Sequence, residues 1–200
     1  ELVATWGNLA NRVLTFAYKH WDGCVPQPGD LRPADHEFLA RVQAGFGVVG
    51  GLLEQVKLRA ALAETMALAA EGNKYLDGQA PWFQIKQDKA EAAITIYTAL
   101  RAIDSLKTLF APFLPFTSQT LHEVLGYDGQ LFGQLRLRRY EEPGGAHQAV
   151  AYDPAGAVGR WAASELPPGQ ALRPPAPLFR KLDPSIVPDE LSRLGPHPAG

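Results

Sequence analysis

The sequence contains a single cysteine, Cys24, among its 200 residues. One cysteine excludes an internal disulfide framework and every cysteine-clustered zinc site, and it fits a reducing cytosol. No run of about 18 uncharged apolar residues occurs, so we expect neither a transmembrane helix nor a membrane partner. The N-terminus, ELVATWGNLANR, has no basic leader and no starting methionine. We therefore expect a piece of a longer, cytoplasmic chain.

An excess of charge of one sign is missing too. Lys and Arg number 19 and Asp and Glu number 21, which gives a formal net charge of −2. Without a global positive field we expect no DNA partner, and any contact with RNA must come from a local patch.

Signatures of catalysis are also absent. The five histidines, at positions 20, 36, 122, 147 and 197, are dispersed without acid–base spacing. The stretch GVVGG lies inside a helical pattern and not between a strand and a helix, so it is no phosphate-binding loop. No cluster of metal ligands occurs. We predict no catalytic residue and no metal site in these 200 residues.

The sequence does hold enough apolar residues for one sizeable core, with 46% hydrophobic and 20% charged residues. Apolar residues recur at helical spacing in five stretches, about 2–21, 35–56, 57–77, 88–111 and 117–125. Short connections between such stretches are typical of antiparallel packing. The pattern predicts an all-α fold, an antiparallel helix bundle.

Boundary residues refine this prediction. Asp35 or one of its neighbours, shortly after Pro33, is expected to cap the second helix, and Thr117 or Ser118 the fifth. The second helix contains four glycines between positions 45 and 51. Glycine weakens a helix by up to about 1 kcal/mol relative to alanine. The glycines therefore indicate close packing or a break, and we expect a kink or boundary there.

Composition changes near residue 126, with six prolines before it and eleven in the 74 residues after it. We therefore divide the chain into a bundle, 1–126, and a C-terminal extension, 127–200. Within the extension, LRLRRYEEPGGAHQAVAY (135–152) favours a short β-hairpin, and ELPPGQALRPPAPLFRKLD (165–183) is too rich in proline for a helix. Trp161, Leu178 and Phe179 are unusual in a free linker, so we expect this tail to pack on the bundle in extended form.

Two features could form a binding site, and each also has a purely structural interpretation. Pro81 ends the preceding helix, so Trp82 should stand at a helix end, where it either fills the end of the core or offers a stacking platform for a base. Asn8, Arg12, Thr15 and Lys19 follow one another at spacings of four, three and four and form one polar stripe. The stripe is either a solvated face or, together with Trp82, a site for single-stranded RNA.

Three segments resemble the anticodon-binding domain of methionyl-tRNA synthetases. They are NLANRVLTFAYKHWDG (8–23), LAAEGNKYLDGQAPW (68–82) and LFAPFLPFTSQTLHEVLG (109–126), in the family's order and at about its separations. The tail segment LPPGQALRPPAPLFRKLD (166–183) is similar to the part by which these enzymes return from the bundle toward their catalytic body.

The resemblance implies recognition of the CAU anticodon of methionine tRNAs. It implies that Asn8 and Arg12 recognise, and Trp82 stacks on, the opened anticodon bases, with Pro81 shaping the approach. It further implies a parent ligase that joins methionine to tRNA, with ATP and Mg²⁺ bound in a catalytic domain whose HIGH- and KMSKS-like motifs have no counterpart here. The implied partners are methionine tRNA and that catalytic domain. Two alternatives remain: the anticodon-binding domain of another class I synthetase, and a helical interaction module without RNA.

Overall fold

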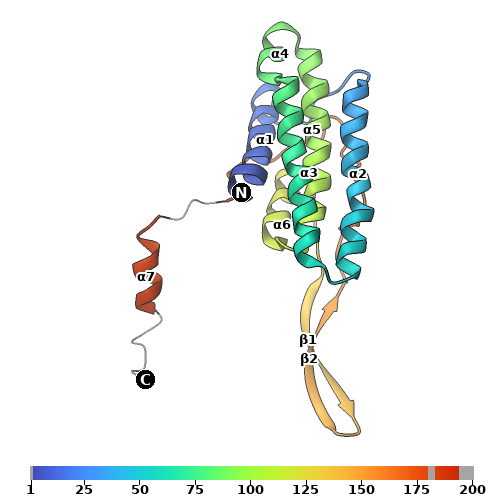
Figure 1. Cartoon of the computed structure of the whole chain (residues 1–200), viewed down its shortest axis with the longest axis vertical. Coiled ribbons are helices and arrows are strands. Elements are labelled where there is room, and N and C mark those ends of the chain that lie inside the picture. The colour runs from blue at the N-terminus through green and yellow to red at the C-terminus, as the bar shows by residue number, and fades with distance from the viewer. Residues whose placement is uncertain (1, 180–182, 194–200) are drawn as a thin grey trace.

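The computed structural model describes residues 2–179 and 183–193 of the chain. These residues form an antiparallel bundle of α-helices from which a two-stranded β-hairpin projects (Figure 1). The predicted fold class is confirmed. After a π-helical turn at Val3–Gly7, the elements are α1 (Asn8–His20), α2 (Pro33–Glu54), α3 (Leu58–Gln79), α4 (Pro81–Gln87), α5 (Lys89–Phe110), α6 (Pro115–Val124), β1 (Gln134–Glu142), β2 (Gly145–Asp153) and α7 (Ile186–Arg193).

Helix α5 forms the centre of the bundle, in contact with α1, α2, α3, α4 and α6. Its N-cap is Asp88, whose carboxylate accepts the backbone N–H of Ala90 at 2.8 Å. From Ala92 to Phe110 it is buried along nearly its whole length. Its small and apolar residues on all sides suit this position, because a helix that is apolar all round belongs in a core.

Helix α2 corrects one prediction, because it runs unbroken through its four glycines. Two of these glycines allow close packing. A Cβ added at Gly45 would lie 2.5 Å from Leu68 Cδ1 of α3, and one at Gly50 would lie 3.1 Å from Trp161 Nε1. Contacts with α3 and with the tail thus account for Gly45 and Gly50, and the expected boundary does not form.

The start of α2 confirms the predicted cap, because Asp35 is the third residue of a capping box, whereas the start of α6 differs from prediction. The N-cap of α2 is Arg32, and Asp35 lies one turn later, where its carboxylate accepts the Arg32 backbone N–H at 2.7 Å. Helix α6 begins at Pro115, earlier than the Thr117 or Ser118 expected. The Ser118 hydroxyl is instead buried and donates to the Lys107 carbonyl at 2.9 Å, which ties α6 to α5.

A short helix, α4, occupies a stretch that the sequence indicated as a turn. Pro81 does end α3, but it also starts α4, since the first helical position needs no N–H donor and suits a proline φ. The link between the two helices is Ala80, in the left-handed region at φ 48°. Trp82 is therefore the second residue of a new helix.

The predicted β-hairpin is confirmed, and it is longer than expected. Strands β1 and β2 pair antiparallel over nine residues each, with Leu135 opposite Tyr152 and Leu137 opposite Val150. Nearly all of the ribbon is exposed to solvent, and the side chains of these four residues are 55–74% exposed.

The tail follows the bundle without a helix or strand between residues 154 and 179. Val25 N–H donates to the Gln170 carbonyl at 2.9 Å, and Arg101 donates to the Ser164 carbonyl at 2.8 Å. Trp161 packs edge-on against Phe46 of α2.

Part of the stretch predicted to be extended, residues 180–182, lies outside the described residues, and the helix α7 that follows was not predicted. The division of the chain at residue 126 stays a prediction. Among the described residues, no helix combines the length and apolar character needed to cross a membrane.

Candidate functional site

The polar stripe predicted on the first helix lies on α1. Leu9, Val13 and Ala17 face the core and are at most 1% exposed, whereas Asn8, Thr15 and Lys19 are exposed. Helical periodicity separates the two sets, because residues three and four apart share one face. The stripe is thus available to a ligand along most of α1.

The junction of α3 and α4 places Trp82 opposite this stripe. Pro81 is buried and fixes the start of α4, while the Trp82 ring is half-buried. Ala80 contributes a left-handed turn that a non-glycine residue adopts only at some cost in energy. A proline and a strained turn together hold Trp82 at a defined place and leave part of its ring open.

Arg12 bridges the stripe and the tryptophan. Its guanidinium carbon lies 4.8 Å from the centroid of the Trp82 ring, a cation–π contact. Its Nη2 donates to Asp77 Oδ1 of α3 at 2.8 Å. The side chains of Arg12 and Asp77 are 29% and 62% exposed, so this ion pair is largely in water and can exchange for other partners.

A cleft of about 410 Å³ opens between these elements. Its floor is apolar and its rim is polar; it is lined by Asn11, Arg12, Val13, Thr15, Phe16, Lys19, His20, Leu76, Pro81, Trp82 and Ile96. Burial, together with the charges of Lys19 and Lys89, lowers the pKa of His20. The permanent charges of the rim are therefore those of Arg12 and Lys19, a local basic site in a chain of net charge −2.

Of the predicted site residues, Arg12, Pro81 and Trp82 come together in this cleft and Asn8 does not line it. Asn8 lies one turn before Arg12 and lines a smaller hollow of about 200 Å³ beside Leu178 and Phe179 of the tail. Asn11 lines both spaces. Its spacing of four from Thr15 would have placed it on the same face, a signal that sequence reasoning missed.

Two further residues of the site, Asp77 and His20, were not predicted either. Asp77 belongs to the NKYLD stretch quoted for the family resemblance, but its contact with Arg12 joins residues 65 positions apart. The His20 ring lies tilted against that of Phe16, with centroids 4.4 Å apart. The spacing of four between these two residues on a helix is a signal that could have indicated their contact, whereas no local pattern indicates that of Asp77.

Similarity to known proteins identifies the family of this chain. A family model described as the anticodon binding domain of methionyl tRNA ligase matches residues 25–137, more than half of the chain. The chain belongs to this family. Membership confirms the resemblance that the three sequence segments indicated.

Relatives and solved structures of this family cover almost the whole chain. A methionine–tRNA ligase of Thermomicrobium roseum is 52% identical over 196 residues, 97% of this chain, and one of Thermobifida fusca is 41% identical over 200 residues. The crystal structure of the free methionyl-tRNA synthetase of Mycobacterium tuberculosis superimposes with a TM-score of 0.71 at 28% identity, over 92% of this chain and 33% of that one. The chain spans about a third of the length of the curated relatives that it matches.

Proposed function

We propose that this chain binds the anticodon loop of methionine tRNAs and reads CAU. The observation that carries the proposal is the position of Trp82: a half-open indole on a rigid helix start, beside Arg12 and above a cleft with a basic rim. Stacking of one base on an aromatic ring is worth roughly 1–3 kcal/mol. Such a platform suits bases that are already unstacked, as in a loop.

Each residue of the proposed site has a separate role. Trp82 stacks on a base, and Pro81 fixes the backbone that presents it. Arg12 donates to base edges or phosphate, and the Asn8 amide, one turn earlier on the exposed face of α1, offers both a donor and an acceptor. RNA would replace Asp77 as the partner of Arg12, an exchange that loses little because exposed ion pairs contribute at most about 1 kcal/mol.

The catalytic step belongs to a part of the parent protein outside this chain. We propose that the parent is a cytoplasmic methionine–tRNA ligase that uses ATP and Mg²⁺, and that its catalytic domain is the second partner of this chain. In residues 2–179 and 183–193, no three His, Cys, Asp or Glu side chains are grouped so as to hold a metal ion. The role that we propose for this chain is to bind and orient the tRNA.

The direct test measures binding of RNA stem-loops that carry the anticodon to the 200-residue chain by fluorescence anisotropy. A stem-loop with CAU should bind more tightly than stem-loops of the same stem with one changed anticodon base. Equal affinity for all of them would contradict the proposal and favour a generic basic surface. No binding of any RNA would leave the helical interaction module as the better explanation.

A further inference from the structure

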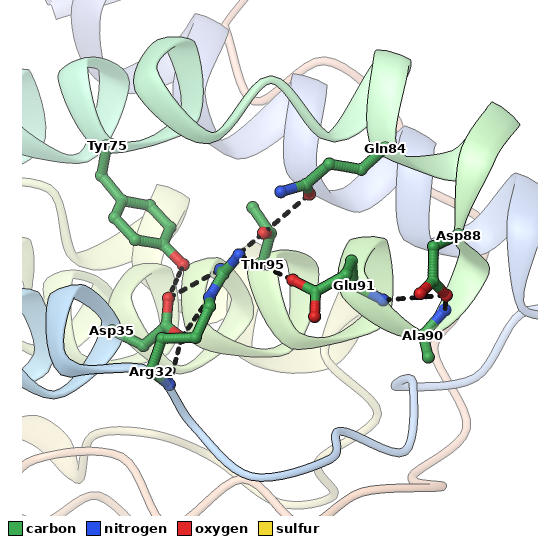
Figure 2. A network of polar contacts seen from close by, with 8 residues as sticks. All are labelled: Arg32, Asp35, Tyr75, Gln84, Asp88, Ala90, Glu91 and Thr95. Carbon is green, nitrogen blue, oxygen red and sulfur yellow. Dashed lines mark hydrogen bonds and ion pairs between the residues drawn. The ribbon is translucent and has the colours of Figure 1, made fainter.

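A relay of hydrogen bonds joins the start of α2 to α4 through the core helix α5 (Figure 2). The Arg32 guanidinium donates from Nη2 to Thr95 Oγ1 at 2.8 Å. Thr95 Oγ1 donates in turn to Gln84 Oε1 of α4 at 2.9 Å. Gln84 lies two residues after Trp82, so the relay ends on the short helix that carries Trp82.

The other end of the relay is a buried carboxylate. Asp35 is 0% exposed and accepts four hydrogen bonds, from the backbone N–H, Nε and Nη2 of Arg32 and from the Tyr75 hydroxyl. Burial works against ionisation of Asp35, but the bonds from Arg32 and Tyr75 outweigh it and lower the pKa of this carboxyl. A charged Asp35 therefore holds the Arg32 fork in one orientation.

The direction of each bond follows from chemistry. A guanidinium can only donate, so the Thr95 oxygen accepts from Arg32, and the Thr95 hydroxyl proton is then free to be donated to Gln84 Oε1. Gln84 is consequently held with its carbonyl oxygen toward α5. Thr95 is itself 0% exposed, which leaves no water to replace these partners.

Helix α4 needs such an anchor. It has seven residues, below the length at which a helix is stable by itself, and Pro81 is its only buried residue. Trp82 and Ile85 are half-buried and Phe83 is 60% exposed, so apolar burial covers only part of the helix. The bond from Thr95 to Gln84 adds a directional polar tie between α4 and the bundle.

We propose, on the basis of the function proposed above, that Thr95 and Arg32 are positioning residues of the anticodon site. They fix α4 on α5 and thereby fix the Trp82 ring relative to Arg12 of α1. Neither residue lines the cleft. Their effect on RNA passes through Gln84 and the helix that carries Trp82.

The test is Thr95→Val, which keeps the shape of the side chain and removes the hydroxyl. Thr95→Ser is its rescue, since it keeps the hydroxyl and loses a buried methyl. Thr65→Val is the matched control: Thr65 is also 0% exposed, and its hydroxyl bonds back to the Ala61 carbonyl within α3. Each 200-residue variant is labelled with 5-fluorotryptophan and studied by ¹⁹F NMR, with the Trp82 signal assigned from Trp82→Phe. The chain has four tryptophans, so Trp6, Trp21 and Trp161 report on the rest of the bundle.

We expect Thr95→Val to move or broaden the Trp82 signal while those of Trp6 and Trp161 stay in place, and to weaken CAU stem-loop binding about tenfold, the equivalent of one lost hydrogen bond. Thr95→Ser should restore both, and Thr65→Val should change neither. An unchanged Trp82 signal in Thr95→Val, or equal movement of all four signals, would overturn the positioning role. A moved Trp82 signal in a chain that binds no stem-loop even as wild type would support the anchoring of α4 and refute the proposed function instead.

Discussion

Two arginine–aspartate pairs in the bundle have the same chemistry and different surroundings. Arg12 and Asp77 meet at 2.8 Å with side chains 29% and 62% exposed, and Arg12 also lies over Trp82. Arg32 and Asp35 meet at the same distance, with side chains 25% and 0% exposed. The first pair shares one hydrogen bond, whereas Asp35 accepts three from Arg32 and a fourth from Tyr75.

The difference shows what makes an ion pair exchangeable. An exposed pair gains little from its charges, because water screens them and would solvate each partner alone. A buried carboxylate has no such alternative, so all of its partners must stay. The two arginines are similarly exposed, so the burial of the partner carboxylate and the number of bonds separate the arginine available to a ligand from the arginine that holds the fold.

The largest expected effect is on stability. Asp35→Ala should lower the free energy of unfolding by about 3 kcal/mol, at the lower end for a broken buried pair because Arg32 stays a quarter exposed. Asp77→Ala should lower it by less than about 1 kcal/mol. Urea unfolding of both variants measures the contrast. Equal losses would show that the two pairs do not differ in the way described.

Trp82→Ala should weaken binding of the CAU stem-loop by roughly 1–3 kcal/mol, because one stacking partner is lost. The fold should remain. The control is Trp161→Ala, which removes a tryptophan that donates to the Phe46 carbonyl at 3.2 Å, away from the cleft, and should leave RNA binding unchanged. A drop in melting temperature of about 10 °C or more in Trp82→Ala would identify its ring as part of the core.

Arg12→Ala and Lys19→Ala should separate discrimination between anticodons from general electrostatic affinity for RNA. Loss of Arg12 should reduce discrimination between CAU and a changed anticodon by about 1–3 kcal/mol, if base contacts in RNA match those in DNA. Loss of Lys19 should weaken all stem-loops alike and make binding less dependent on salt. Anisotropy titrations at several salt concentrations measure both. Equal, non-discriminating losses would reduce the stripe on α1 to a generic basic face.

The smallest expected effect is on the pH at which the free energy of unfolding begins to fall in acid. The lowered pKa of Asp35 stabilises the fold above the ordinary carboxyl pKa, and this contribution is lost as the pH falls through the folded-state value. Tyr75→Phe removes one of the bonds that lower this pKa. Its stability should therefore begin to fall at a higher pH than that of the wild type. Denaturation between about pH 5 and pH 2 measures this difference. The same dependence of stability on pH in the wild type and in Tyr75→Phe would exclude this contribution.

The fold was predictable wherever a helix buries one regular face. The periodicity of 88–111 anticipated α5 to within a residue at each end, because its burial is continuous. The boundary expected within α2 was wrong because the reason for Gly45 lies in Leu68 of another helix. Helix α4 was missed because a proline ends one helix and can start the next, and the two cases look alike in sequence.

The candidate site was predictable only in part. The polar stripe led to Arg12, and Pro81 at the end of a helix led to Trp82. The structure brings Arg12 and Trp82 into contact. The relay through Arg32, Thr95 and Gln84 was not predicted, since it joins residues 63 and 11 positions apart. Contacts of that kind depend on how the helices pack, and no local pattern encodes them. The binding roles of Asn8, Arg12, Pro81 and Trp82 stay predictions.

The hairpin has a consequence for how this domain can change over time. Gln134 and Asp153 are paired, so the chain enters and leaves the ribbon at one place. Removing or adding residues in pairs, one from each strand, would keep the same entry and exit and leave the helices untouched. Residues 134–153 can therefore gain or lose length in related sequences without disturbing the helices. The helices of the bundle cannot change length as freely, because most of them pack on α5.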